Sequence, residues 1–113
     1  MVLASFISPC REGRRATPRA HERDGLPFIE VFVGCPLAVA GARDPKGLYR
    51  RARAGQIPHF TGIDDPYEAP LAPDVQLCSA SMTVEQETRS VPTALEARSL
   101  ATCAAVDGAA GWR

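Results

Sequence analysis

The sequence predicts an α/β fold built on a parallel sheet, because two apolar runs flank a polar stretch. Residues 2–7 and 28–33 are rich in apolar, β-branched and aromatic side chains, which is typical of strands covered on both faces. The Arg-rich residues 10–25 between them are long enough for a helix. A strand–helix–strand order implies parallel pairing with a right-handed crossover. Pro18 is expected to interrupt that helix or to set its start.

Two shorter helices are expected after the second apolar run. Pro36 is expected at the first position of a helix over residues 37–43, where its missing N–H costs nothing. Residues 44–57 are expected to form another helix, and Gly55 is suited to end it because glycine readily adopts a left-handed conformation.

The remaining chain is expected to hold one more strand and a final helix. Residues 58–74 are rich in proline and acidic side chains, which predicts an extended loop, and residues 75–78 read as a short strand. Thr83 and Gln86 have the spacing of a capping box, so a helix should start there, and Pro92 is expected to interrupt it. We expect the last dozen residues to be frayed or disordered.

Length and composition limit what the chain can build alone. Its 113 residues suit one small domain, but 18 of the hydrophobic residues are alanines and only 29 are larger apolar or aromatic residues. The two clear strands cannot form a stable sheet alone, since three or more are normally required. We therefore expect residues 1–82 to be the later part of a larger domain, truncated at its N-terminus, and residues 83–113 to be a diverged helical or disordered tail.

The charge is unevenly distributed although the net charge is zero. Residues 1–60 carry ten Arg or Lys against five Asp or Glu, and residues 61–113 carry three against eight. A basic half suits an anionic ligand such as a nucleotide phosphate or a sulfate, and a solvated arginine-rich surface is the alternative. Nucleic acid is not expected as a partner, because no aromatic residues alternate with the basic ones.

The spacing of the cysteines and histidines predicts neither a metal site nor a set of disulfide bonds. The four cysteines are far apart without a C-x-x-C pair, and the two histidines are 38 positions apart. No secretory signal and no membrane-spanning run is present in the sequence, so reduced thiols and a cytoplasmic location are expected.

The stretch from residue 28 to residue 77 carries a family resemblance. The blocks DPKGLY, ARAG, FTGID and PYEAP occur in this order, and FISP precedes them at residues 6–9. Together they resemble the later half of the adenylylsulfate kinases, over residues 2–9 and 28–77. The resemblance implies a P-loop kinase-type three-layer fold. It also implies transfer of the ATP γ-phosphoryl group to the 3′-hydroxyl of adenylylsulfate, with ATP and Mg²⁺ as cofactors.

Family positions map onto single residues of this chain. The resemblance implies catalytic roles for Ser8, which matches a phosphoserine position, and for Lys46, which would reach the anionic groups of the substrate. It implies that Arg43, Arg50 and Arg53 lie in a mobile lid near the nucleotides. The residues implied to line the adenylylsulfate pocket are Ile7, Ser8, Lys46, His59, Phe60 and Gly62.

Three of these residues also have a structural interpretation. Ser8 can cap the following helix, and Phe60 can anchor its own loop in the core. Lys46, the single lysine beside twelve arginines, can be incidental, or it can mark a place where a compact ammonium is needed.

The phosphate-binding pattern G-x-x-x-x-G-K-[ST] does not occur in the 113 residues. The kinase interpretation therefore predicts no turnover by this chain alone. Two alternatives stay open: a non-catalytic module that senses the phosphorylated product, as in domains fused to ATP sulfurylases, or a remnant without function. The expected partners are ATP and adenylylsulfate, and the resemblance allows a homodimer or association with an ATP sulfurylase.

Overall fold

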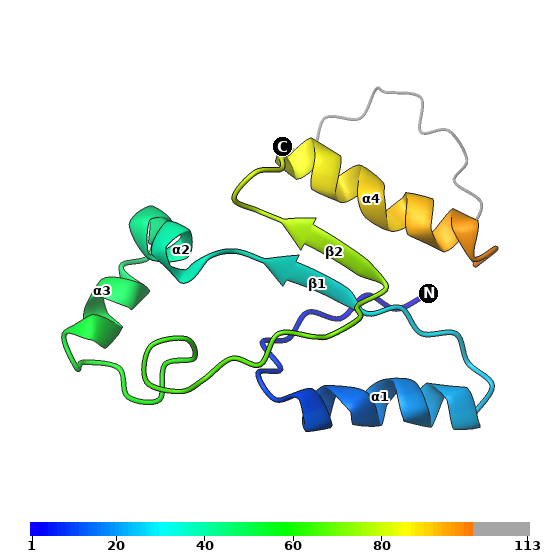
Figure 1. Cartoon of the computed structure of the whole chain (residues 1–113), viewed down its shortest axis with the longest axis horizontal. Coiled ribbons are helices and arrows are strands. Elements are labelled where there is room, and N and C mark those ends of the chain that lie inside the picture. Colours follow the sequence, from blue (N-terminus) through cyan, green and yellow to red (C-terminus); the bar gives the residue numbers. More distant parts are fainter. Residues whose placement is uncertain (101–113) are drawn as a thin grey trace.

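The computed structural model describes residues 1–100, and the predicted frayed end lies outside the described residues. The described part of the chain is an α/β structure with two parallel strands and surrounding helices (Figure 1). Its elements are α1 (Arg11–Arg23), β1 (Val31–Gly34), α2 (Leu37–Arg43), α3 (Leu48–Arg53), β2 (Val75–Cys78) and α4 (Val84–Ala97).

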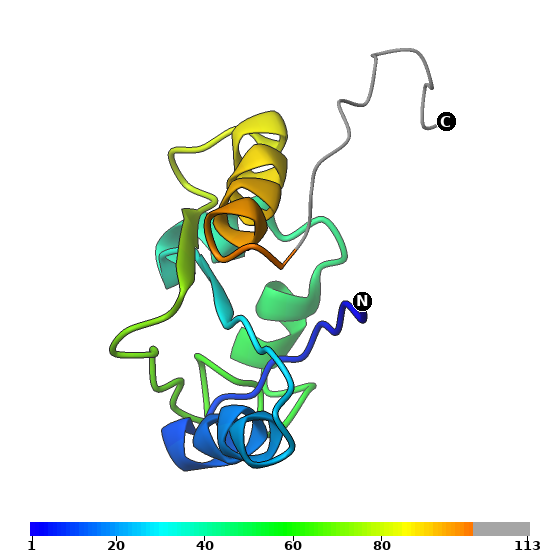
Figure 2. The ribbon, with the colours of Figure 1, turned by 90° about the vertical axis from the view of Figure 1, so that its right-hand side faces the viewer.

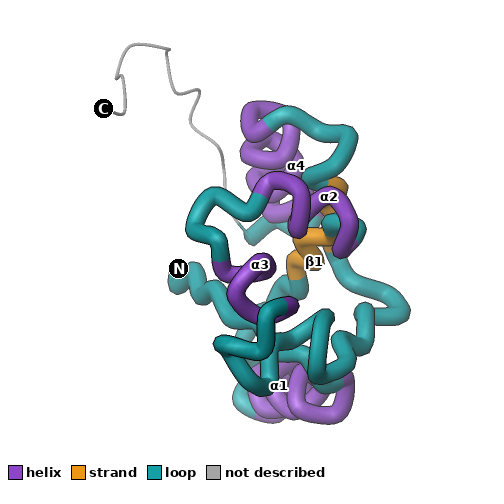
Figure 3. Tube along the Cα trace, turned by 90° about the vertical axis from the view of Figure 1, so that its left-hand side faces the viewer, coloured by secondary structure: helices purple, strands orange, loops and turns teal. Residues whose placement is uncertain are grey.

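The sheet pairs β1 with β2 in parallel, from Val31 beside Val75 to Gly34 beside Cys78. The connection between the strands carries α2, α3 and the proline-rich loop. Both helices lie beyond the carboxyl end of β1, whereas α1 and α4 lie on opposite sides of the strand pair (Figures 1 and 3). The parallel sheet is confirmed, with β2 as the partner of β1.

Residues 2–7 do not form the predicted strand. They run as an extended segment whose side chains are largely exposed, with Val2 at 91% and Phe6 at 82%. A strand needs a neighbour that satisfies its backbone groups and covers its side chains. Within residues 1–100 no strand pairs with this segment, so its apolar pattern alone does not produce a strand.

Both helices predicted to break at proline continue through it. Pro18 lies inside α1 and Pro92 inside α4. A proline removes one N–H donor and crowds the carbonyl four residues earlier. Helix α4 offsets this loss with the predicted capping box, in which Thr83 Oγ1 accepts from the Gln86 amide at 3.2 Å, and with packing against β2 (Figure 2).

The two short helices differ slightly from the prediction. Pro36 is the N-cap of α2 and not its first helical residue. The helix expected over residues 44–57 is shorter, because residues 44–47 form a turn in which Gly47 has φ 66°. Gly55 ends α3 as expected: it has φ 72°, and its amide donates to the Ala52 carbonyl at 2.9 Å.

The core of the described residues is small. Ala52, Val75 and Leu77 are the buried apolar residues, at 3%, 8% and 6% exposure. Residues 75 and 77 alternate with the exposed Gln76, so β2 buries one face. Among residues 1–100, no helix combines the length and the apolar character needed to cross a membrane.

Candidate functional site: a cationic helical turn beside an aromatic pair

A dense group of cations follows the carboxyl end of β1. Arg43 ends α2, Lys46 lies in the turn after it, and α3 supplies three arginines within its six residues. Asp44 is the one acidic residue between positions 43 and 53. We call residues 43–53 the cationic turn.

Among residues 1–100, Asp44 forms no ion pair with these cations, and its carboxylate instead accepts from amides in the first turn of α3. Its Oδ1 accepts from the Tyr49 amide at 3.1 Å, and its Oδ2 accepts from the Arg50 amide at 3.0 Å. Partial desolvation raises the pKa of Asp44, but hydrogen bonds from the backbone amides of Arg50, Tyr49 and Leu48, together with the positive charge of Arg50, outweigh it and lower the pKa below its usual 3.8. The carboxylate is therefore ionised at neutral pH and engaged with the helix start.

Most of the cations have no carboxylate partner. Among residues 1–100, Arg43, Lys46, Arg51 and Arg53 form no ion pair. The Arg53 guanidinium lies over Gly41 of α2: a Cβ built on that glycine would be 2.7 Å from Arg53 Nη2. The absence of a side chain at Gly41 thus allows α3 to place this arginine against α2. Unpaired, exposed cations of this density are suited to an anion.

An aromatic contact joins the cationic turn to the proline-rich loop. The ring centroids of Tyr49 and Phe60 are 5.1 Å apart in an edge-to-face arrangement. Phe60 also starts a tight turn, since its amide donates to Asp64 Oδ2 at 3.1 Å and its carbonyl accepts from the Ile63 amide at 3.0 Å. The Phe60 ring thus holds its loop against Tyr49 of α3, but it is half-buried and is not among the buried core residues of the described chain.

The neighbours of Phe60 have left-handed backbones. His59 has φ 55° and an exposed side chain, whose Nδ1 is 3.4 Å from Asp65 Oδ2. Gly62 has φ 89°, which favours glycine, and its amide donates to the Asp65 carbonyl at 2.7 Å. The loop thus places His59, Phe60 and Gly62 within one compact turn.

Ile7 and Ser8 belong to a second group at the start of α1. Both are exposed, and Ser8 has φ 42°, an uncommon value for a residue with a side chain. Ser8 does not cap α1, whose N-cap is Cys10. In the described residues, no hydrogen bond, ion pair or ring contact joins Ser8 directly to the cationic turn. The segment is joined instead to the end of the proline-rich loop, where the Glu68 amide donates to the Pro9 carbonyl at 2.9 Å.

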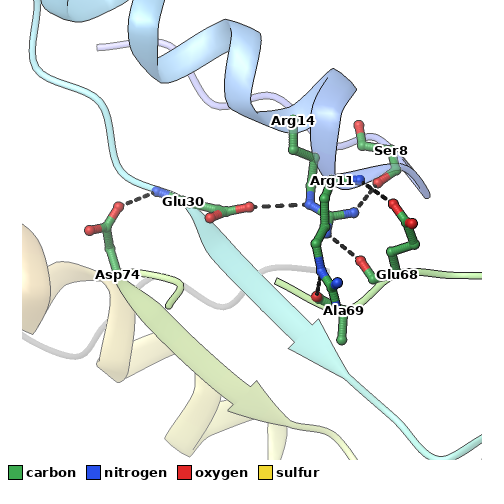
Figure 4. A network of polar contacts seen from close by, with 7 residues as sticks. All are labelled: Ser8, Arg11, Arg14, Glu30, Glu68, Ala69 and Asp74. Atoms are coloured by element: carbon green, nitrogen blue, oxygen red, sulfur yellow. Dashed lines mark hydrogen bonds and ion pairs between the residues drawn. The ribbon is translucent and has the colours of Figure 1, made fainter. Parts of the chain in front are cut away.

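Sequence reasoning missed the residues that hold this second group in place. Arg14 on α1 donates to the backbone carbonyls of Ser8 and Glu68 and forms an ion pair with Glu30 (Figure 4). Asp74 in turn accepts from the Glu30 amide at 2.7 Å. The sequence could have pointed to Glu30, because it is the one charged residue within the apolar residues 28–33. It could not have pointed to Arg14, which is one of many arginines.

The residues present do not fit a bound metal ion or a phosphate cradle for ATP. In the part of the chain that the structure describes, no three His, Cys, Asp or Glu side chains come together. The sequence also lacks the glycine-rich loop whose amides would surround the ATP phosphates.

Comparison with known proteins agrees with these motifs. Residues 1–78 match the adenylylsulphate kinase family. An adenylyl-sulfate kinase of Geotalea daltonii is 52% identical over 91 residues, which cover 80% of this chain and 44% of the relative. The adenylyl-sulfate kinase of Saccharomyces cerevisiae is 54% identical over 84 residues, which cover 74% of this chain and 42% of the relative.

A solved structure shows the same fold. The APS kinase of Mycobacterium tuberculosis, in complex with AMPPNP and APS, matches with a TM-score of 0.80 and 44% identity, covering 85% of this chain and 55% of that one. The chain thus spans about half the length of the relatives that it matches.

Proposed function

Since this chain belongs to the adenylylsulfate kinase family, we propose that it supplies the adenylylsulfate side of a kinase active site. The reaction would move the ATP γ-phosphoryl group to the 3′-hydroxyl of adenylylsulfate and give 3′-phosphoadenylyl sulfate. The observation that carries this proposal is the cationic turn, whose unpaired cations lie beside the Tyr49–Phe60 pair. Cations beside an aromatic face suit a ligand that combines a purine with anionic groups.

Each element of this site has a distinct task in the proposal. Phe60 packs against the adenine of adenylylsulfate, and Lys46 neutralises its phosphate or sulfate. Phosphoryl transfer depends mainly on positioning and charge neutralisation, so the cations must converge on the reacting groups. The compact turn formed by Gly62 and exposed His59 closes one side of the pocket, and the lid arginines Arg43, Arg50 and Arg53 approach the nucleotide phosphates.

Ile7 and Ser8 complete the pocket from the start of α1. The Ser8 side chain is exposed, and its hydroxyl makes no hydrogen bond within residues 1–100. It is therefore available to a ligand. We propose that this hydroxyl contacts bound adenylylsulfate and orients the acceptor 3′-hydroxyl.

ATP supplies the transferred phosphoryl group when it is bound. Because the 113 residues lack G-x-x-x-x-G-K-[ST], we propose that this chain by itself binds adenylylsulfate without turnover. The same lack favours a second candidate, a module that binds the product 3′-phosphoadenylyl sulfate without catalysis. Association with a second copy or with an ATP sulfurylase would suit either role.

Isothermal titration of the 113-residue chain tests the proposal, with circular dichroism on the same sample. We expect adenylylsulfate to bind, and Lys46→Gln to weaken binding about tenfold, the effect of one lost charged contact. Arg89→Gln is the matched control, because Arg89 lies on α4 in an exposed pair with Glu85. Tighter binding of the phosphorylated product would favour the sensor. A folded chain that binds neither nucleotide would refute both roles.

A further inference from the structure

Arg14 joins three separate segments of the chain. It lies in the first turn of α1, and its side chain is only 13% exposed. Its Nη1 donates to the Ser8 carbonyl at 2.5 Å, and its Nη2 donates to the Glu68 carbonyl. Its Nε is 3.4 Å from Glu30 Oε1 (Figure 4). Its guanidinium carbon lies 5.5 Å from the centre of the Tyr67 ring.

These contacts use the geometry of a guanidinium and not only its charge. The planar group presents donors in a fixed fork, so two carbonyls that it binds are held at a fixed separation and angle. Ser8 lies six residues before Arg14, and Glu68 lies 54 residues after it. Arg14 therefore fixes the start of α1 relative to the end of the proline-rich loop. The Glu30 carboxylate contacts Nε of the same guanidinium and so helps to orient it.

A second set of bonds joins the same two segments without involving Arg14. The Arg11 amide donates to Glu68 Oε2 at 2.7 Å, and Arg11 Nε donates to the Ala69 carbonyl at 2.9 Å. Removal of the Arg14 side chain should therefore loosen the junction and leave the segments attached. The main effect would be on Ser8, because its carbonyl would lose the hydrogen bond from Arg14.

Ser8 has a backbone that needs such support. Its φ of 42° is rarely adopted by residues with a side chain and persists only where the surroundings impose it. In the described residues, the Arg14 guanidinium is the group that binds the Ser8 carbonyl. The hydroxyl on the same residue remains exposed.

We propose that Arg14 is a positioning residue, which holds Ser8 in its left-handed conformation and so presents its hydroxyl to adenylylsulfate in one orientation. This inference rests on the proposed function of Ser8. A preorganised group binds more tightly because less conformational freedom is lost when the ligand arrives. The expected loss of affinity without Arg14 is about tenfold, as for a hydrogen bond to a charged group.

The test compares Arg14→Gln, Arg14→Lys and the control Arg15→Gln, an exposed neighbour on α1. Adenylylsulfate affinity is measured by titration, and hydrogen exchange is measured in peptides covering residues 8–14 and 66–70. For Arg14→Gln we expect about tenfold weaker binding and faster exchange in both peptides, with exchange in α4 unchanged. Arg14→Lys should behave like Arg14→Gln, because an ammonium lacks the fork. Arg15→Gln should behave like the unaltered chain.

Three results would overturn the inference. Full rescue by Arg14→Lys would show that charge alone is needed, and unchanged affinity in Arg14→Gln would show that Ser8 needs no support. Faster exchange throughout the chain would show a general structural role. Glu30→Gln, which removes only the orienting carboxylate, should weaken binding less, and no effect on affinity or exchange would count against the orienting contact. An unaltered chain that binds no adenylylsulfate would refute the proposed function instead.

Discussion

Gly41→Ala should stabilise the protein modestly, because a gain in α2 exceeds a local steric cost. Gly41 lies inside α2, where alanine is favoured over glycine by about 1 kcal/mol. The added Cβ would lie 2.7 Å from Arg53 Nη2 and 3.3 Å from Arg53 Cζ, which is closer than atoms normally approach. The Arg53 side chain must therefore move by a few tenths of an ångström or more.

The cost of that movement is small, since Arg53 is exposed and forms no ion pair among residues 1–100. A shifted arginine rotamer costs about 0.5 kcal/mol. The net gain is then about 0.5 kcal/mol, which corresponds to an increase in Tm of about 2 °C for a domain of this size. Thermal unfolding followed by circular dichroism measures it.

Two further variants separate the gain from the cost. Gly13→Ala in α1 is the matched control, because no atom lies within 4 Å of the Cβ built there, and it should gain close to the full 1 kcal/mol or so. In an Arg53→Ala background, Gly41→Ala should also gain about 1 kcal/mol. A loss of stability in Gly41→Ala that Arg53→Ala does not relieve would refute the reasoning.

Three other outcomes can be measured. Leu77→Ala should cost about 2–5 kcal/mol in chemical unfolding, because Leu77 is one of few buried side chains, whereas Val33→Ala at a 60% exposed position should change stability by less than about 0.5 kcal/mol. Thr83→Ala should cost about 1 kcal/mol of helix stability by removing the capping box, seen as lower helicity in α4. The lowered pKa of Asp44 means that its contribution to α3 is present above pH 3.8 and is lost as the pH falls through the folded pKa. The Tyr49 amide shift should therefore titrate with acid, and an unaltered titration in Asp44→Asn would contradict this assignment.

Local features of the fold were predictable because their signals lie within a few residues of each other. The Thr83–Gln86 capping box and the glycine that ends α3 both form as predicted. Each is a short-range arrangement in which a side chain or a glycine satisfies the backbone of an adjacent turn. The strand at β2 was predictable for the same reason, from a short apolar run after a proline-rich loop.

The sequence also carried the family blocks, and with them the candidate residues Lys46 and Phe60. These residues come together in one site only through contacts that the folded chain makes. The edge-to-face packing of Tyr49 on Phe60 and the use of Asp44 as a cap and not as an ion-pair partner follow from how the chain turns after α2. Neither is encoded in residue spacing alone.

By itself, the sequence determined the family, the parallel α/β character, the start of α4 and the end of α3, because these depend on motifs and on neighbours along the chain. Tertiary structure decided which strand pairs with β1, that residues 2–7 stay unpaired, and that α1 and α4 continue through their prolines. It also decided the role of Arg14, whose partners are as far as 54 residues away. A strand partner or a buried carbonyl acceptor is chosen by proximity in space, which an apolar pattern or a single arginine cannot specify.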